Sequence, residues 1–138
     1  MADIRIRFDD TFDDVLEELR RIEYLSDLSS IALLAASIGF ENQVKAPSRG
    51  TKDVRLAVML GAPGALALFN AIALASGEIE DEDPLNHEQL SARAKVFESF
   101  VNGGLKSLQE IRAQGRTLSV AIPELINQKL KRARSINV

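Results

Sequence analysis

The chain has 138 residues, with 17 Lys and Arg against 20 Asp and Glu, a net charge of −3 and no cysteine. This length suffices for a single domain, residues 1–138, that folds around its own core. The lack of cysteine excludes a disulfide framework, thiol catalysis and Cys-ligated zinc, and it fits a reducing, cytoplasmic location.

Charge is segregated along the chain. Residues 77–88 hold six acids and no Lys or Arg, whereas residues 112–138 hold six basic residues and one acid, Glu124. A basic face can meet phosphate or an acidic neighbour even in an acidic protein. The simpler interpretation is a solvated helix whose basic C-terminal end is favoured by the helix dipole.

The N-terminal residues predict a short strand. Ile4, Ile6 and Phe8 alternate with Arg5 and Arg7, which is the period-2 pattern of a half-buried strand with a basic exposed side. No apolar signal-peptide stretch is present, so we expect no secretory signal.

Two helices are expected next. The first begins at Thr11, a candidate N-cap, and ends near Tyr24. The second, Leu28–Ile38, is apolar on most sides, is capped by Ser26 or Asp27, and ends at Gly39 in a left-handed conformation.

The middle of the chain predicts a loop, a strand and a helix. Residues 41–53 contain Pro47, Gly50 and several basic residues, so we expect a basic surface loop. Apolar residues alternate over 54–60 and predict a second strand, followed by a turn at 62–64 and a helix at 65–76. The two strands pair either with each other or with their copies in a second subunit.

The C-terminal third is expected to be helical. Its longest helix begins at Pro84 or Asn86 and carries Gly103 and Gly104 in its apolar stripe. A weak strand or turn at 117–122 then leads to a last helix that begins at Pro123. The elements together predict a mainly α (α+β) fold, a compact helical domain with two short strands that is oligomeric.

The Gly103-Gly104 pair points to close packing. Each glycine in a helix costs roughly 1 kcal/mol relative to alanine, so the pair suggests that another backbone approaches closely. We therefore take Asn102, Gly103 and Gly104 as candidate assembly residues. The expected core comprises Ile31, Leu34, Ile38, Leu56, Val58, Leu68, Ile72, Phe97, Val101 and Leu105.

The sequence offers little chemistry. His87, the only histidine, stands among acids, but a solvated acidic turn explains this pattern better than a metal site does. No Gly-x-Ser-x-Gly elbow is present, and the turn at 61–64 lacks the Walker lysine. The run 56–76 is broken by Pro63 and rich in alanine, so a buried strand and helix are favoured over a membrane span. We expect no enzyme, cofactor, metal site or membrane attachment.

DNA contact is a further possibility. A backbone-reading surface would need basic residues from separate parts of the chain to converge. The candidates are Arg5, Arg7, Lys45, Arg49, Lys52 and Arg55, with Lys129, Lys131, Arg132 and Arg134 at the C-terminal end. The chain has no recognisable base-reading module and few aromatic residues for stacking.

Three segments carry a family resemblance: Ile31–Phe40, Ala71–Glu80 and Phe100–Leu108, of which Asn-Gly-Gly-Leu is the most distinctive piece. They resemble the family of DNA phosphorothioation-associated protein 4, also called Dnd system-associated protein 4, over about residues 25–112. In layout, an N-terminal Ile-Arg strand and a late Gly-rich helix are similar to the small Dnd sulfur-modification subunit. This chain lacks the basic run on that subunit's helices, which counts against direct DNA binding.

The resemblance implies a protein encoded beside the machinery that places sulfur in the DNA backbone and restricts unmodified phage DNA. It supplies no catalytic residues for this chain. We therefore expect a non-enzymatic accessory subunit that assembles with larger ATPase or nuclease subunits of an antiphage defence complex. The alternative is a small oligomeric DNA-binding regulator of the ribbon-helix-helix type.

Overall fold

The computed structural model describes residues 3–77 and 87–136 of the chain. The fold is mainly helical with a small two-stranded sheet, which confirms the predicted class. The elements follow in the order β1 (Arg5–Phe8), η1 (Asp10–Phe12), α1 (Asp13–Arg20), η2 (Glu23–Leu25), α2 (Leu28–Asn42), β2 (Lys52–Arg55), α3 (Leu56–Met59), α4 (Ala65–Ala75), α5 (His87–Ala113) and α6 (Leu118–Ile136), where η marks 3₁₀ helices.

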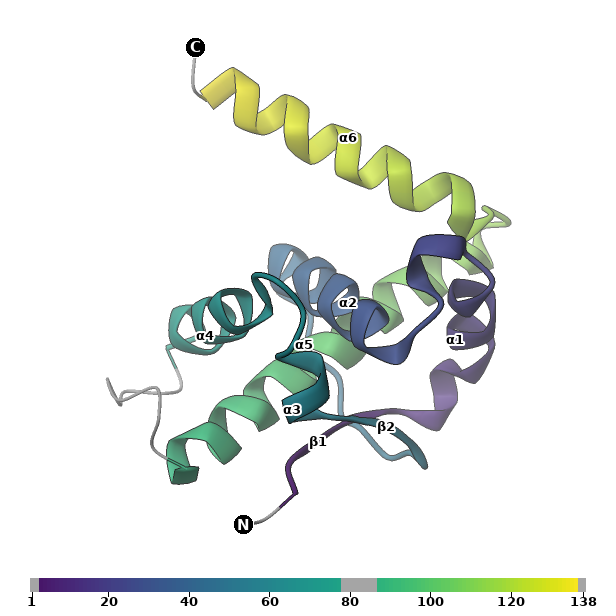
Figure 1. The fold of residues 1–138 in the computed structure, drawn as a ribbon. Helices are drawn as coiled ribbons and strands as arrows, with labels where there is room; N and C mark the ends of the chain where they lie inside the picture. The colour runs from purple at the N-terminus through teal and green to yellow at the C-terminus, as the bar shows by residue number, and fades with distance from the viewer. Residues whose placement is uncertain (1–2, 78–86, 137–138) are drawn as a thin grey trace.

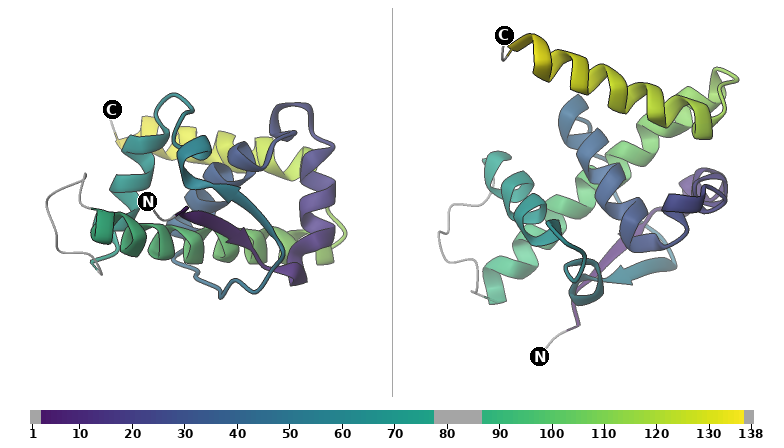
Figure 2. Two further views of the ribbon diagram at one scale, coloured as in Figure 1. Left: turned by 60° about the horizontal axis from the view of Figure 1, so that its bottom comes forward. Right: turned by 45° about the horizontal axis from the view of Figure 1, so that its top comes forward.

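Helix α5 is the centre of the fold. It runs across the molecule, with α2 and α4 packed on it and the β1–β2 ribbon beside it, while α6 leads away from the other helices (Figure 1, Figure 2). Phe97, Val101, Leu105 and Leu108 of α5 are completely buried. Their spacing is the one that keeps side chains on one face of a helix, so this stripe determines how the molecule packs around α5.

Most of the predicted core is confirmed. Ile31, Ile38, Leu56, Ile72, Phe97, Val101 and Leu105 are buried, and Leu34 and Leu68 are partly buried against the core. Val58 is the exception, because 60% of it is exposed.

The second strand is shorter than predicted. β2 ends at Arg55, opposite Arg5, where its partner strand begins. One more bond follows, from Leu56 N to Ile4 O at 2.9 Å, and the chain then turns into α3. In α3 the buried pair is Leu56 and Met59, three residues apart, which leaves Val58 on the outside. A strand at 56–60 would have had no neighbour to pair with.

Several helix ends also differ from expectation. Thr11 is not the cap of α1; its backbone N–H instead donates to the Asp9 carboxylate at 2.9 Å at the start of η1. Helix α1 ends at Arg20, before Tyr24. The predicted Asp27 cap of α2 is confirmed, since Asp27 accepts from Ser30 N at 2.7 Å.

Helix α2 continues past Gly39 to Asn42, and Gln43 takes the left-handed conformation, with φ 53°. Gly39 is therefore helical and packs against α5. The turn at Gly64, with φ 77°, and the helix that follows it are as predicted.

The C-terminal helix begins earlier than predicted. α6 starts at Leu118, so residues 118–122 are helical and Pro123 lies inside the helix. The cap comes from a distant part of the chain, because Glu18 of α1 accepts from Leu118 N at 2.7 Å. The acidic segment 78–83 lies outside the described residues. Within the described parts of the chain, no helix is long and apolar enough to cross a bilayer.

Candidate interaction surfaces

The β1–β2 ribbon brings four of the DNA-contact candidates together. The strands are antiparallel, with Arg5 opposite Arg55, Arg7 opposite Asp53 and Phe8 opposite Lys52. Arg5 and Arg7 alternate with the buried Ile6 and Phe8, so both arginines are exposed, as the sequence predicts. Lys45 and Arg49 lie on the neighbouring segment 43–51.

Acidic residues compensate much of the ribbon's positive charge. Two arginines directly opposite each other destabilise a sheet, and Asp3 offsets this by accepting from Arg5 Nε at 2.9 Å and from Arg55 Nε at 3.3 Å. Arg5 also pairs with Asp53 at 2.8 Å, and Lys52 pairs with Asp13 at 3.0 Å. A phosphate would have to compete with these carboxylates for the same cations.

The pKa values of Asp3 and Arg5 are shifted by these ion pairs. Burial alone would raise the pKa of Asp3, but hydrogen bonds from Arg55 and Arg5 outweigh it and hold that pKa below its usual value. Hydrogen bonds to Asp53 and Asp3 raise the pKa of Arg5. The ribbon therefore keeps both signs of charge at neutral pH.

A shallow polar groove of about 350 Å³ runs between the ribbon and α5. Its charged lining combines Arg5, Arg7 and Lys95 with Asp3 and Glu98. Both Glu98 oxygens are already used, accepting from Arg7 N at 2.8 Å and from Ser48 Oγ at 2.5 Å. The groove is of mixed charge and is not a purely basic surface for nucleic acid.

Asn102 closes the outer edge of β1. This completely buried side chain accepts from Asp9 N at 2.8 Å and donates to Arg7 O at 2.9 Å. The carboxylate of Glu98, one helical turn earlier, accepts a hydrogen bond from Arg7 N. Two side chains of α5 thus satisfy the backbone groups that a neighbouring strand would otherwise take. Between Arg7 and Asp9, β1 has no free edge for a strand from a second copy.

Asp9 ties the same edge to the segment 43–51. It is 8% exposed, and its carboxylate accepts from Arg49 N at 2.8 Å as well as from Thr11 N. A hydrogen bond from the Thr11 side chain, helped by the Thr11 and Arg49 backbone, lowers the pKa of Asp9 against the opposing effect of burial. The Asp9 carboxylate therefore connects the end of β1 to the start of η1 and to the backbone of Arg49.

The glycines permit the close backbone approach that the sequence predicts. A Cβ on Gly104 would lie 1.8 Å from Ala35 O of α2, and one on Gly103 would lie 1.8 Å from Val44 O. On the opposing helix, a Cβ on Gly39 would lie 2.1 Å from Phe100 O. Asn102, Gly103 and Gly104 are all buried inside one chain, and their part in assembly between subunits stays a prediction.

Lys45 and Arg93 have roles that the sequence did not suggest. The Lys45 ammonium lies 5.1 Å from the centroid of the Phe100 ring, a cation–π distance. Arg93 of α5 is only 1% exposed and donates to Asn70 Oδ1 of α4 at 3.3 Å. No pattern marks Arg93 in the sequence, because an arginine on a helix is usually solvated.

A second candidate surface lies on α6, where this helix leads away from the other helices (Figure 1). The beginning of α6 is anchored, with Leu118, Ala121 and Ile122 buried. Beyond it, Ile126 is 43% exposed and Leu130 is 51% exposed. The spacing of Ile122, Ile126 and Leu130, four residues apart, is a sequence signal for one apolar stripe. The stripe was not predicted, because residues 117–122 were expected to form a weak strand or turn.

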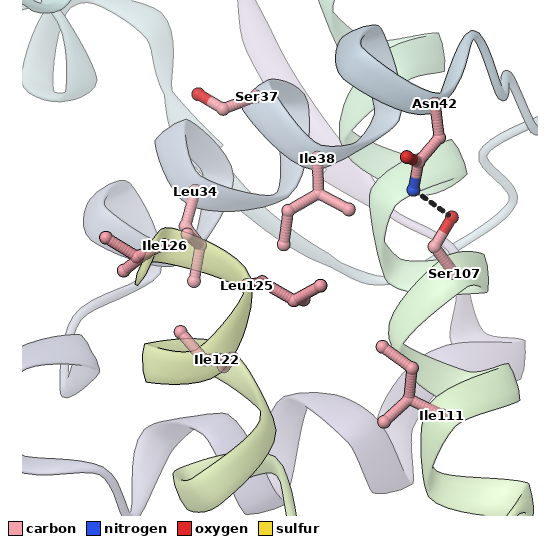
Figure 3. A pocket seen from close by; sticks show the side chains of 9 residues that line it. All are labelled: Leu34, Ser37, Ile38, Asn42, Ser107, Ile111, Ile122, Leu125 and Ile126. Carbon is pink, nitrogen blue, oxygen red and sulfur yellow. Dashed lines mark hydrogen bonds between the residues drawn. The ribbon is translucent and has the colours of Figure 1, made fainter. Parts of the chain in front are cut away.

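An apolar pocket of about 230 Å³ opens between α2, α5 and α6. Figure 3 shows Leu34 and Ile38 of α2, Ile111 of α5 and Leu125 of α6 around a common space. Asn42 and Ser107 close one side with a long hydrogen bond of 3.5 Å. Helix α6 thus leaves part of the apolar surface of α2 and α5 uncovered.

The described residues contain no group of three His, Cys, Asp or Glu side chains arranged to hold a metal ion. The side chain of His87 lies outside the described part, so the acidic metal site that we considered there is not tested.

The ribbon, the glycine-packed α2–α5 crossing and the projecting α6 define a small, mainly helical protein with one two-stranded sheet in its described residues. A comparison with family models finds a match over residues 5–137, nearly the whole chain. The chain belongs to the family of DNA sulphur modification system-associated protein 4. The match extends beyond the segments that carried the resemblance in the sequence. Searches of curated proteins and of solved structures found no match.

Proposed function

We propose that this protein is a non-enzymatic accessory subunit of a DNA phosphorothioation-linked restriction system in antiphage defence, and that it acts by protein–protein assembly. The family name supplies the association with DNA sulphur modification. The proposed partners are larger ATPase or nuclease subunits of the system. The cysteine-free sequence fits action in the cytoplasm.

The observation that carries this proposal is the exposed apolar surface of α6 and the pocket beneath it. Single exposed apolar residues are common, but here Ile126 and Leu130 continue a stripe that is buried at Ile122. An apolar stripe next to an open apolar pocket is typical of a protein-binding surface. In the proposed role, this surface of α6 and the pocket contacts another protein of the system.

The ribbon supports the second candidate, a DNA-binding regulator, less well. An antiparallel ribbon with exposed Arg5 and Arg7 is present, as that function requires. Ribbon-helix-helix proteins, however, pair strands between subunits, whereas β1 here pairs with β2 of its own chain and its other edge meets Glu98 and Asn102. The ion pairs of Arg5, Lys52 and Arg55 further reduce the charge available to phosphate.

Copurification with the other proteins of the system tests the assembly role. The tagged chain, coexpressed with them, is expected to retain a larger subunit through a high-salt wash, because an apolar contact is not screened by ions. Deleting the gene should then weaken restriction of unmodified phage. A chain that purifies alone from the complete system, with restriction unchanged after deletion, would contradict the proposal.

Duplex binding separates the two candidates. We expect no binding tighter than about 1 µM at physiological salt, a level typical of non-specific attachment. The matched variants are Arg5→Ala with Arg7→Ala on the ribbon, and Arg20→Ala with Arg21→Ala, which remove the same charge from the exposed end of α1. Nanomolar binding that only the ribbon variant loses would favour the regulator.

A further inference from the structure

We infer that the apolar pocket between α2, α5 and α6 binds a large apolar side chain on an acidic, amphipathic helix of a partner protein. The inference rests on the proposed function, since it names the chemistry of the partner that this surface binds. Amphipathic helices bind other proteins by laying their apolar face into a hydrophobic groove. The volume of the pocket, its apolar rim and the charge of α6 beyond it support this assignment.

The pocket has room for a large apolar side chain. Its volume is about 230 Å³, whereas an apolar cavity of about 150 Å³ in another protein already binds benzene. As Figure 3 shows, the space is surrounded by Leu34, Ile38, Ile111 and Leu125. None of the described residues that line it carries a charge. A phenyl ring or a branched aliphatic side chain therefore fits, while a charged group would be buried without a partner.

The rim of the pocket continues the apolar surface outward along α6. Ile126 lines the pocket and is 43% exposed, and Leu130, one turn further along, is 51% exposed. Ile122, one turn earlier, is covered by its own chain. A helix that places one apolar side chain in the pocket can therefore contact Leu130 with a second, about three or four residues away. That spacing is typical of the apolar face of an amphipathic helix.

The charge of α6 beyond the pocket selects an acidic partner. Residues 127–136 contain no acid and four basic residues, Lys129, Lys131, Arg132 and Arg134. The one acid within residues 118–136 is Glu124, which already pairs with Arg116. Charges across an interface are arranged to complement each other, so acidic residues on the partner are expected opposite this end of α6.

Helix geometry sets the distance between the apolar anchor of the partner and its acids. Positions 129 and 132 follow Leu125 by four and seven residues, a spacing that keeps them on one side of α6. At about 1.5 Å per residue, the basic positions lie about 6–14 Å along the helix from Leu125. A partner helix lying along α6 therefore needs Asp or Glu about four to nine residues from its anchor. DNA phosphates would also attract these cations, but a sugar–phosphate backbone has no large apolar group to fill the pocket.

Photo-cross-linking in the assembled system identifies what lies at the rim. The full chain carries p-benzoylphenylalanine in place of Ile126 and is coexpressed with the other proteins of the system. We expect a cross-link to a segment of a larger subunit that has a large apolar residue with Asp or Glu about four to nine residues away. A cross-link to a neutral or basic segment, to DNA or to a second copy of this chain would overturn the inference.

Filling the pocket tests its role. Leu125→Trp places an indole of the chain itself in the space and should raise the dissociation constant of the complex with that subunit at least about 10-fold. The control, Leu74→Trp on α4, whose parent residue is 45% exposed, should leave it unchanged. Leu130→Asn alters only the exposed rim and should weaken binding about 10-fold, because one apolar side chain loses its burial. Its control is Leu66→Asn, whose parent residue is also 51% exposed. Thermal melts check that all four variants fold.

Charge reversal tests the acidic character of the partner. Lys129→Glu with Arg132→Glu should slow association about 10-fold at low salt, because charges at the edge of an interface act mainly on the association rate. The control, Arg20→Glu with Arg21→Glu on the exposed end of α1, makes the same change in net charge. Stopped-flow or biosensor measurements give the rates. Equal slowing in both variants, or none in either, would overturn the assignment of an acidic partner.

The same variants separate this inference from the proposed function. A subunit that copurifies, and that binds Leu125→Trp and Leu130→Asn as tightly as wild type, would overturn the inference and leave the proposed function in place. A chain that purifies alone from the complete system would overturn both. Weaker binding of these two variants, with both controls unchanged, supports the pocket as the binding site.

Discussion

The α2–α5 crossing and helix α6 differ in how tightly they pack against the rest of the chain. At the crossing, Gly39 and Gly104 let two backbones approach closely, and side chains of α5 bind the edge of β1 at the same level. Helix α6 is anchored through its first turns and the Glu18 cap, and farther along it Ile126 and Leu130 are exposed. A close backbone contact tolerates almost no added volume, whereas an exposed helix tolerates substitution and remains free to bind.

The largest expected effect is at Gly104. Gly104→Leu should lower the free energy of unfolding by at least about 3 kcal/mol, because the new Cβ would meet backbone that cannot move aside. Urea denaturation measures the change. The control is Ala113→Leu on the exposed end of the same helix, with an expected change below about 0.5 kcal/mol. Equal stability of the two variants would mean that the helices do not cross at Gly104.

The second-largest loss of unfolding free energy is expected at Asn102. Asn102→Leu keeps a similar volume but leaves Asp9 N and Arg7 O without their buried partner, so we expect a loss of about 2–4 kcal/mol in unfolding free energy. Asn42→Ala, which removes only the long bond to Ser107, should cost less than about 1 kcal/mol. If chemical denaturation finds Asn102→Leu as stable as wild type, the edge of β1 is satisfied in another way.

A smaller effect is expected at Glu18. Glu18→Ala removes the acceptor for Leu118 N and the ion pair with Arg112 Nε at 3.0 Å, which should cost about 1–2 kcal/mol. Amide exchange should increase mainly at the beginning of α6, and little at the α2–α5 crossing. The exposed neighbour Glu17→Ala is the control, and exchange that rises equally at the crossing would show that the two regions are not held separately.

The smallest effect is the pH dependence that Asp9 contributes. Its pKa is lower in the folded chain than in the unfolded chain, so its carboxylate stabilises the fold above the unfolded pKa of about 3.9. This contribution is lost as the pH falls through the folded pKa. Asp9→Asn should therefore flatten the fall in melting temperature below about pH 5, measured by thermal melts over a series of pH values. Identical acid profiles for wild type and Asp9→Asn would contradict this role.

The sequence predicted the helical class because periodicity is local. The stripe of α5, the Asp27 cap and the turn at Gly64 depend on residues within a turn or two of one another. The same holds for β1, whose alternation is unambiguous over five residues. The candidate surfaces were predicted in part, since the exposure of Arg5 and Arg7 follows from that alternation.

Boundaries that depend on distant partners were not predictable in this way. β2 ends where β1 no longer offers a partner, and α6 begins at Leu118 because Glu18, 100 residues earlier, accepts its N–H. The ion pairs that compensate the ribbon likewise join residues far apart in the chain, as Arg5 and Asp53 do.

Short-range patterns in the sequence thus determined most of the helical segments and the apolar faces of β1 and α5. Only the tertiary structure decided that Gly104 packs against α2 and Gly103 against Val44 inside one chain, and that Ile126 and Leu130 of α6 are exposed. The physical reason is that periodicity reports which side of an element is buried but not what covers it. Burial depends on contacts between elements distant in sequence, and those exist only once the chain has folded.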